Sequence, residues 1–135
     1  MRDLERSLNR ARELVSLSED EFLRDYRNSY TLRMLIVEMV ESIINAGLLL
    51  AREEVETYAQ VLDRLLEKGI IDASTANALK ALIRLRNLIV HRYWEVDDLR
   101  IYREARAGGL DSIEGFISAI REVAENDSAK SRRES

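Results

Sequence analysis

A chain of 135 residues with 46% hydrophobic side chains is large enough for one domain around one sizeable core. It contains no cysteine, no proline and one histidine, which excludes disulfide frameworks, thiolate nucleophiles and zinc sites built from cysteine and histidine. A net charge of −4 at pH 7 argues against binding of nucleic acid through bulk positive charge, although a local basic patch is compatible with it.

We expect no membrane-crossing segment in this chain. Its first ten residues, MRDLERSLNR, are charged where a signal peptide needs apolar side chains. The apolar run around Gly47–Ala51 is short, and it is bounded by charged residues such as Glu41 and Arg52. The expected location is therefore the cytoplasm.

Apolar residues recur at helical spacing almost throughout, and no long stretch keeps a period of two, so the expected fold class is all-α. The expected helices are one through Leu4 and Val15, a short one after a Ser18–Glu21 capping box, and longer ones over 30–54, 57–68, 73–93 and 96–125. Gly69 is expected to stop the helix over 57–68, and the last helix is expected to break near Gly108 and Gly109.

These elements predict a single domain over residues 1–125, arranged as an up-and-down bundle of four to five helices. The apolar stripe of the helix over 30–54 is broad, which predicts burial on more than one side. Residues 126–135 are polar, and we expect them to form a disordered tail.

One interval is basic although the chain as a whole is acidic. No acidic residue occurs between Asp72 and Glu95, and the interval contains the following basic side chains: Lys80, Arg84, Arg86, His91 and Arg92. A locally basic helix on an acidic protein suits a ligand that bears phosphate. The alternative is that Arg84 and Arg92 pair with acids on neighbouring helices.

Polar residues of catalytic type flank an apolar centre within this interval, in the stretch Arg86-Asn87-Leu88-Ile89-Val90-His91-Arg92-Tyr93. Asn87 and His91 are four positions apart and share a helix face. Arg86 and His91 are five apart, which places them about 140° apart around an ideal helix. They meet on one ligand only if Arg86 swings round, if the helix loosens near its end, or if a second subunit completes the site.

Arginine, a polar residue, three further positions, histidine, any residue and tyrosine form a pattern that resembles the signature of HEPN domains. The similarity is closest to the HepT-like toxins that pair with minimal nucleotidyltransferases. It continues through Glu95-Val96-Asp97 and Ile101-Tyr102, and upstream it includes Tyr58, Leu65 and Gly69-Ile70-Ile71. Glu41 and Asn45 lie on the long helix, where the family often has acidic or amide residues. The resemblance covers roughly Leu4 to Val123.

The resemblance implies a HEPN-like helical bundle that forms a homodimer, with the motif helices facing each other across a cleft. It also implies a toxin of a toxin–antitoxin pair that acts as a metal-independent endoribonuclease, with RNA as substrate and without a cofactor. By position, Arg86 and His91 would be catalytic and Asn87 supporting. Tyr93 would be the tyrosine that a partner nucleotidyltransferase modifies to silence the toxin.

The chemistry of these side chains agrees with that assignment. RNA is cut without metal when its 2′-hydroxyl attacks the adjacent phosphorus, and the imidazole of histidine can move protons near neutral pH. The permanently cationic guanidinium of Arg86 can stabilise the charge that develops. Arg84 and Arg92 are candidate phosphate contacts. Because there is one histidine per chain, separate acid and base roles need both subunits or His91 acting in turn.

Several alternatives stand beside this assignment. His91 can be a histidine at a helix end that interacts with the helix dipole, and Tyr93 and Trp94 can be an aromatic lid on the core. The other tyrosines are expected to be packing residues; they are Tyr26, Tyr30, Tyr58 and Tyr102. The whole chain can instead be a non-catalytic subunit that binds nucleotide or substrate for a nucleotidyltransferase, or a helical oligomerisation subunit with Arg86 and His91 buried in intramolecular pairs.

Overall fold

The computed structural model describes residues 2–134, and within them it contains helices and no β-strand. The elements are α1 (Arg2–Val15), α2 (Glu19–Arg24), α3 (Tyr26–Ala51), α4 (Tyr58–Glu67), α5 (Ala73–His91), the 3₁₀ turn η1 (Tyr93–Glu95), α6 (Asp98–Glu104), the wide turn η2 (Ala105–Gly109) and α7 (Leu110–Glu134). The predicted all-α helical bundle is confirmed: α1, α3, α4, α5 and α7 form it, and α2 and α6 are short connecting helices.

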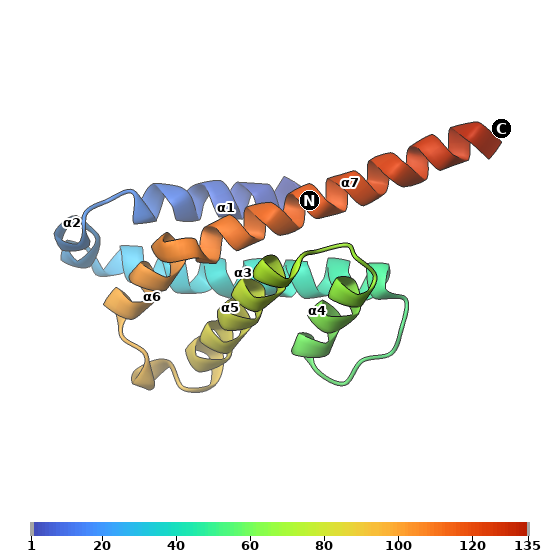
Figure 1. Ribbon diagram of the computed structural model, residues 1–135. Helices are drawn as coiled ribbons and strands as arrows, with labels where there is room; N and C mark the ends of the chain where they lie inside the picture. The colour runs from blue at the N-terminus through green and yellow to red at the C-terminus, as the bar shows by residue number, and fades with distance from the viewer. Residues whose placement is uncertain (1, 135) are drawn as a thin grey trace.

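Helix α3 is the central element of the bundle. Helices α1, α4 and α5 all pack against it, and α7 packs against both α1 and α5 (Figure 1). The residues of α3 that face these neighbours are almost fully buried; among them are Leu32, Ile36, Met39, Val40, Ile43 and Ile44. The predicted burial of this helix on more than one side is therefore confirmed.

The apolar stretch of the chain is longer than expected. By length and composition alone, Tyr26–Ala51 is sufficient to cross a bilayer, and 39% of its most apolar stretch is buried inside the structure. The expectation rested on the run at Gly47–Ala51 and missed the continuity of the whole helix. Because three other helices cover α3, its apolar character also has a role within the fold.

Capping residues define most of the helix boundaries. Ser18 and Glu21 form the predicted capping box of α2, and the Asp72 side chain accepts a hydrogen bond from the Thr75 backbone N–H at the start of α5. Gly69 adopts the left-handed conformation (φ 73°) after α4, as predicted. By contrast, α3 begins at Tyr26 and not at residue 30, because Asp25 caps it by accepting a hydrogen bond from the Arg27 backbone N–H at 3.0 Å.

The C-terminal part departs from the expectation in one respect. The predicted break occurs at Gly108, whose φ of 149° no other residue type adopts easily, and it separates α6 from α7. Residues 126–134 are helical and not frayed, and the end of α7 extends past the other helices (Figure 1). Five of these nine residues are Ala, Lys, Arg or Glu, which favour helix, and the segment continues α7 past its last core contact.

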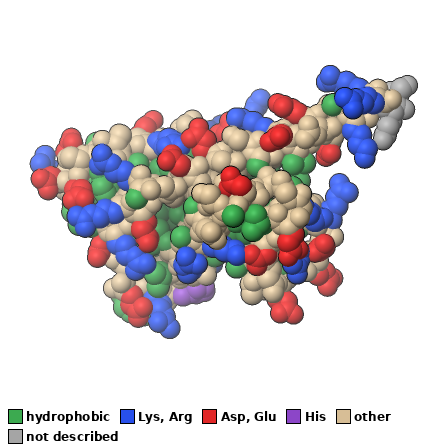
Figure 2. All heavy atoms as spheres, viewed as in Figure 1, with side chains coloured by type: hydrophobic (Ala, Val, Ile, Leu, Met, Phe, Trp, Pro, Cys, Tyr) green, Lys and Arg blue, Asp and Glu red, His purple; other side chains and the backbone are tan. Residues whose placement is uncertain are grey.

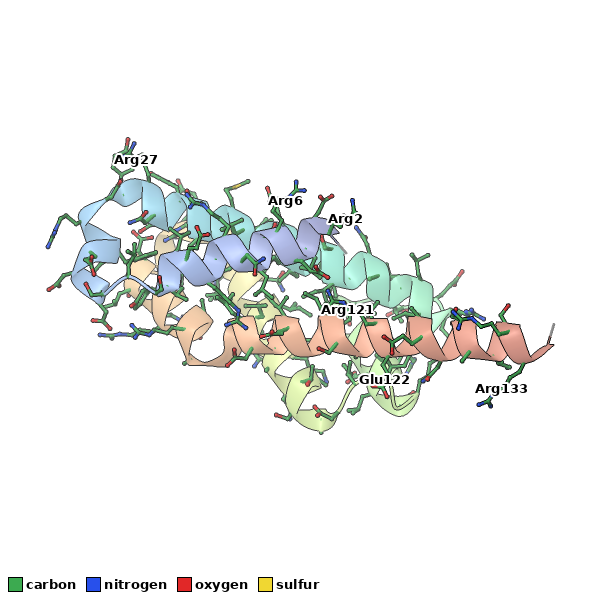
Figure 3. All side chains as sticks on the ribbon, turned by 90° about the horizontal axis from the view of Figure 1, so that it is seen from above. Arg2, Arg6, Arg27, Arg121, Glu122 and Arg133 are labelled. Atoms are coloured by element: carbon green, nitrogen blue, oxygen red, sulfur yellow. The ribbon has the colours of Figure 1, made fainter. Side chains whose placement is uncertain are left out.

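Ion pairs join α7 to α1 along the outside of the bundle. Arg12 contacts Asp111 at 3.2 Å and Glu114 at 2.5 Å, and Arg121 pairs with Glu5. Figure 3 shows Arg121 between the two helices and Arg133 near the far end of α7, beyond them. These pairs are exposed and contribute little stability individually, so the position of α7 depends mainly on its buried residues Ile113, Phe116 and Ile117.

Gly47 of α3 lies directly against side chains of α4. A Cβ atom at this position would lie 2.6 Å from Cγ1 of Val61 and 3.4 Å from Cδ1 of Leu65. The first distance is too short for two carbon atoms, whereas the second is ordinary contact. The absence of a side chain at Gly47 therefore allows α4 to pack against α3.

Gly47→Ala is expected to destabilise the protein by about 1–2 kcal/mol, because overpacking against Val61 outweighs the gain in helix propensity. In a Val61→Ala background, where Cγ1 is absent, the same substitution should be stabilising. Urea denaturation of the four variants of this cycle measures the coupling. Additive effects of the two substitutions would contradict the proposed contact.

Candidate active site

Helix α5 positions most of the predicted site residues. Its start is fixed by Asp72, and the hydrogen bond from the Thr75 backbone N–H lowers the pKa of that carboxyl. One face of the helix is buried in the core, through Ala76, Leu79, Leu82, Ile83, Leu85 and Ile89. Arg84, Asn87 and His91 consequently point to the surface, whereas Arg86 lies at the boundary of the core and is half-buried.

Arg86 is held by residues of two neighbouring helices. Its guanidinium forms an ion pair with Glu41 of α3, and it lies 5.4 Å from the centre of the Tyr58 ring of α4. The Tyr58 hydroxyl donates a hydrogen bond to the same carboxylate at 3.3 Å, and Arg86 donates another to the Asn87 side chain at 3.0 Å. The Arg86 side chain is only 15% exposed. These contacts fix the orientation of the guanidinium.

One N–H group of Arg86 forms no hydrogen bond within this cluster. Its Nε atom is buried and has no hydrogen-bond partner among residues 2–134. A buried donor without a partner costs free energy, so the position of Arg86 is not optimal for stability alone. The guanidinium borders a surface cavity of about 370 Å³, the Arg86 cavity, which is lined by Thr57, Tyr58, Ala59, Lys80, Ile83, Arg84, Arg86 and Asn87.

His91 lies at the last position of α5 and is exposed. It borders a second cavity of about 470 Å³, the His91 cavity, which is lined by Arg84, Asn87, Leu88, His91, Arg92 and Arg100. No acidic residue lines this cavity. Figure 2 shows the histidine (purple) at the lower edge of the molecule with Lys and Arg side chains (blue) beside it. The local field therefore favours an anion.

The arginines of the His91 cavity form long ion pairs or none. Arg92 contacts Glu95 at 3.6 Å and Arg100 contacts Glu104 at 3.6 Å, in both cases between exposed side chains. Arg84 is exposed and forms no ion pair within the part of the chain described. Within the described residues, the ion pair of Arg92 is with Glu95 of the adjacent turn η1, and no ion pair joins Arg84 or Arg92 to an acid of another bundle helix.

Arg86 and His91 do not meet within a single chain. They line different cavities, and these two cavities share Arg84 and Asn87 along their common border. This arrangement follows from the angle between the two positions around the helix and from the capture of Arg86 by Glu41. Of the three ways in which they could converge, a swing of Arg86 toward His91 does not occur in the structure.

Tyr93 does not lie on the motif helix, although the sequence predicts helix through this residue. Helix α5 ends at His91 because Arg92 leaves helical geometry (φ −143°, ψ 49°), and Tyr93 lies in the turn η1. Its side chain is 64% exposed and contacts Trp94 edge to face, with ring centres 5.3 Å apart. Trp94 is itself 69% exposed, so the expected aromatic lid on the core is wrong.

Arg33 of α3 holds the turn that carries Tyr93, a role that the sequence did not predict. Its guanidinium donates to the backbone carbonyl of Tyr93 at 3.3 Å and to that of Val96 at 2.9 Å, and it pairs with Asp98 at 2.8 Å. The Arg33 side chain is only 16% exposed. It therefore ties the turn that carries Tyr93 to the central helix. In the sequence, the signal for this role was the presence of an arginine within an apolar helical stripe.

Tyr26 and Tyr30 are exposed, so the expectation that they are packing residues is wrong. They are 70% and 65% exposed, and their rings contact edge to face at 5.8 Å. Both line a third cavity, which also includes Tyr93. Tyr102 conforms to the expectation, since it is buried and packs on Phe22 at 4.9 Å, and Tyr58 packs under Arg86.

Across residues 2–134, no three side chains of histidine, aspartate or glutamate come together as a candidate metal site. Asn45, which lies near Glu41 in the sequence, is exposed, and no hydrogen bond or ion pair engages it within the described residues. The polar side chains that line the three cavities carry guanidinium, ammonium, imidazole, amide, hydroxyl and phenol groups, together with the carboxylate of Asp98.

The family model of the HepT-like ribonucleases matches residues 4–120 of this sequence. The chain belongs to this family. The match includes the Arg86–Tyr93 motif, the Glu41–Arg86 pair and the turn that Arg33 holds. No curated protein matches the sequence closely enough to add to this assignment.

Two solved structures share the fold. One is the cytosolic protein of unknown function YutE from Bacillus subtilis, with a TM-score of 0.74 and 19% identity over 93% of this chain and 90% of that one. The other is the crystal structure of a toxin–antitoxin with AMP-PNP, with a TM-score of 0.75 and 20% identity over 87% of this chain and 91% of that one. This HepT-like chain therefore has the HEPN-type bundle that its motif predicts.

Removal of the Glu41 carboxylate is expected to destabilise the protein, because it leaves the Arg86 guanidinium buried without its ionic partner. We expect Glu41→Ala to lower the free energy of unfolding by about 1–3 kcal/mol, and Glu41→Gln, which keeps an acceptor, to lower it less. Glu38→Ala, on the same helix but exposed, is the matched control. A loss no larger than that of Glu38→Ala would show that the pair does not hold Arg86.

Proposed function

We propose that this HepT-like protein is the toxin of a toxin–antitoxin pair and acts as a metal-independent endoribonuclease. The observation that carries the proposal is the His91 cavity, in which an exposed imidazole stands among Arg84, Arg92 and Arg100 without a lining acid. A phosphodiester is the anion that such a cavity suits, and RNA supplies its own nucleophile. Membership of a ribonuclease family supports the same assignment.

In the proposed reaction, the imidazole of His91 accepts the proton of the ribose 2′-hydroxyl as O2′ attacks the adjacent phosphorus. The O2′–P bond forms and the P–O5′ bond breaks, while O5′ takes up a proton from a general acid. Arginine side chains stabilise the negative charge of the phosphorane. The products are a 2′,3′-cyclic phosphate and a 5′-hydroxyl.

A homodimer would complete this site. Each chain has one histidine, so a separate general acid requires His91 of a second copy or a return of the proton by the same imidazole. Arg86 lies in a different cavity from His91 of its own chain, and a second α5 facing the first would bring Arg86 of one copy toward His91 of the other. Asn87, which borders both cavities, is well placed to support either contact.

We further propose that the antitoxin is a minimal nucleotidyltransferase that silences the toxin by modifying Tyr93. The phenol is exposed on a turn, so its oxygen can reach the active site of another protein. Transfer joins the phenol oxygen to the α-phosphorus of a nucleoside triphosphate and releases pyrophosphate and the phenolic proton. The added phosphate is an anion next to Arg92, and it would compete with RNA for the His91 cavity.

His91→Ala is expected to lower the rate of RNA cleavage by at least about 100-fold, because it removes the group that moves the proton. The measurement is gel analysis of a labelled RNA in the presence of EDTA, with identification of the terminal cyclic phosphate. Lys68→Ala, an exposed cation outside both cavities, is the control for loss of positive charge. Equal cleavage by wild type and His91→Ala would exclude the assignment, and RNA binding without cleavage would support the non-catalytic binding subunit instead.

Tyr93→Phe should cleave RNA at a rate close to that of the wild type but should escape silencing, because the ring remains and its oxygen is lost. Incubation with the cognate nucleotidyltransferase and ATP, followed by mass spectrometry, should show a nucleotidyl adduct on the wild type alone. Tyr26→Phe, in the same cavity, tests whether the modification is confined to one phenol. An adduct on Tyr93→Phe equal to that on the wild type would place the modification elsewhere.

A further inference from the structure

Beside the His91 cavity lies an aromatic cavity to which the proposed reaction assigns no role. It has a volume of about 370 Å³ and is called the Tyr93 cavity. Its principal lining residues are Tyr26, Tyr30, Arg33, Met34, Tyr93 and Asp98. They come from the first turns of α3 and from the segment that follows α5.

The tyrosine rings of this cavity are exposed to an unusual degree for large side chains. Tyr26, Tyr30 and Tyr93 are 64–70% exposed, and Met34 is 58% exposed. Tyr26 and Tyr30 contact at nearly right angles, with an interplanar angle of 88°. Edge-to-face contact leaves the face of at least one ring free, and a free aromatic face beside phenol hydroxyls matches a flat base with polar edges.

The wall of the cavity is preorganised by Arg33. Its hydrogen bonds to the carbonyl groups of Tyr93 and Val96 hold the turn in place, so the position of the Tyr93 backbone is fixed before any ligand arrives. Asp98 is the one acidic residue that lines the cavity, and its carboxylate is paired with Arg33. That pairing offsets the repulsion that an unpaired carboxylate would exert on a polyanion.

The aromatic and basic cavities flank the same turn. Arg92 lines the His91 cavity, and the next residue, Tyr93, lines the aromatic one. The two cavities share no lining residue, and consecutive Cα atoms are about 3.8 Å apart, so the chain passes directly from one cavity to the other at this turn. Cationic side chains that follow a phosphate backbone, with aromatic rings beside them, are the combination that binds single-stranded nucleic acid.

We propose that the Tyr93 cavity is a base-stacking subsite that takes an unpaired base of the RNA, next to a phosphate held in the His91 cavity. The inference rests on the proposed function and adds the requirement that the substrate be single-stranded at this position. A second copy of the chain is the competing occupant. The concave shape and the polar ends of the tyrosines favour a base, and exposed leucines of α3 lie at its other end, at Leu48 and Leu49.

The test measures the affinity of each variant for a fluorescent single-stranded 2′-O-methyl RNA, which binds but cannot supply the attacking hydroxyl. Tyr26→Ala and Tyr30→Ala should each weaken binding by about tenfold, the loss of one stacking contact. Tyr30→Phe, which keeps the flat ring and loses only the hydroxyl, should weaken binding much less than Tyr30→Ala does. Tyr30→Leu should be as weak as Tyr30→Ala, because leucine is apolar but offers no flat face.

Leu49→Ala, an exposed position on the same helix outside the cavity, is the matched control and should bind like the wild type. A second comparison uses an RNA with abasic positions, for which the wild type and Tyr30→Ala should have equal affinity. Sedimentation of every variant reports its oligomeric state. Dissociation of the alanine variants into monomers, or full binding by Tyr30→Leu, would indicate a protein interface and overturn the proposal.

The outcomes also separate this inference from the proposed function. If the wild type binds and cleaves RNA while Tyr26→Ala and Tyr30→Ala bind as tightly as it does, the base-stacking subsite is wrong and the nuclease assignment stands. If the wild type binds no RNA, both are wrong. Thermal denaturation checks that the alanine variants are folded, and their high exposure predicts little change in melting temperature.

Discussion

Burial of α3 is the constraint on which the rest of the molecule depends. A helix of 26 residues with an apolar surface on several sides requires neighbours, and α1, α4 and α5 cover its buried residues, while Met34 and Leu49 remain exposed. The few polar groups on its partly buried surface are therefore costly unless they are paired. Arg33 and Glu41 are two such groups, and each is satisfied by a residue of the candidate site. The core helix thus also sets the geometry of the functional residues.

Two buried cations are used in different ways. Arg33 donates hydrogen bonds to the backbone of a turn and pairs with Asp98, so its role is structural support for Tyr93. Arg86 shares a carboxylate with Tyr58, keeps a buried N–H without a partner, and lines the Arg86 cavity. An acidic protein of net charge −4 presents cationic groups here through local placement, without an overall basic surface.

Local signals in the sequence were sufficient for the helices and for the motif. The sequence predicted a helix that begins at residue 73, where α5 begins, and the stop at Gly69 and the break near Gly108 followed from glycine alone. The end of α5 was missed because neither glycine nor proline marks it, and Arg92 leaves the helix without such a residue. Tyr93 was consequently placed on a helix face that it does not occupy.

Contacts between distant residues could not be predicted in the same way. Glu41 and Arg86, and likewise Arg33 and Asp98, are far apart in the sequence, and no local spacing relates them. Tyr26 and Tyr30 recur at helical spacing as core residues do, so only the fold shows that they remain exposed. The position of His91 at an open cavity was likewise decided by tertiary structure.

The common border of the Arg86 and His91 cavities has an evolutionary consequence. Arg84 and Asn87 line both, so a substitution at either position alters two environments at once. The effects of changes in the two cavities are therefore expected to be epistatic, since residues in contact with shared partners do not contribute additively. A substitution at Arg84 or Asn87 that favours one cavity is therefore also tested by its effect on the other.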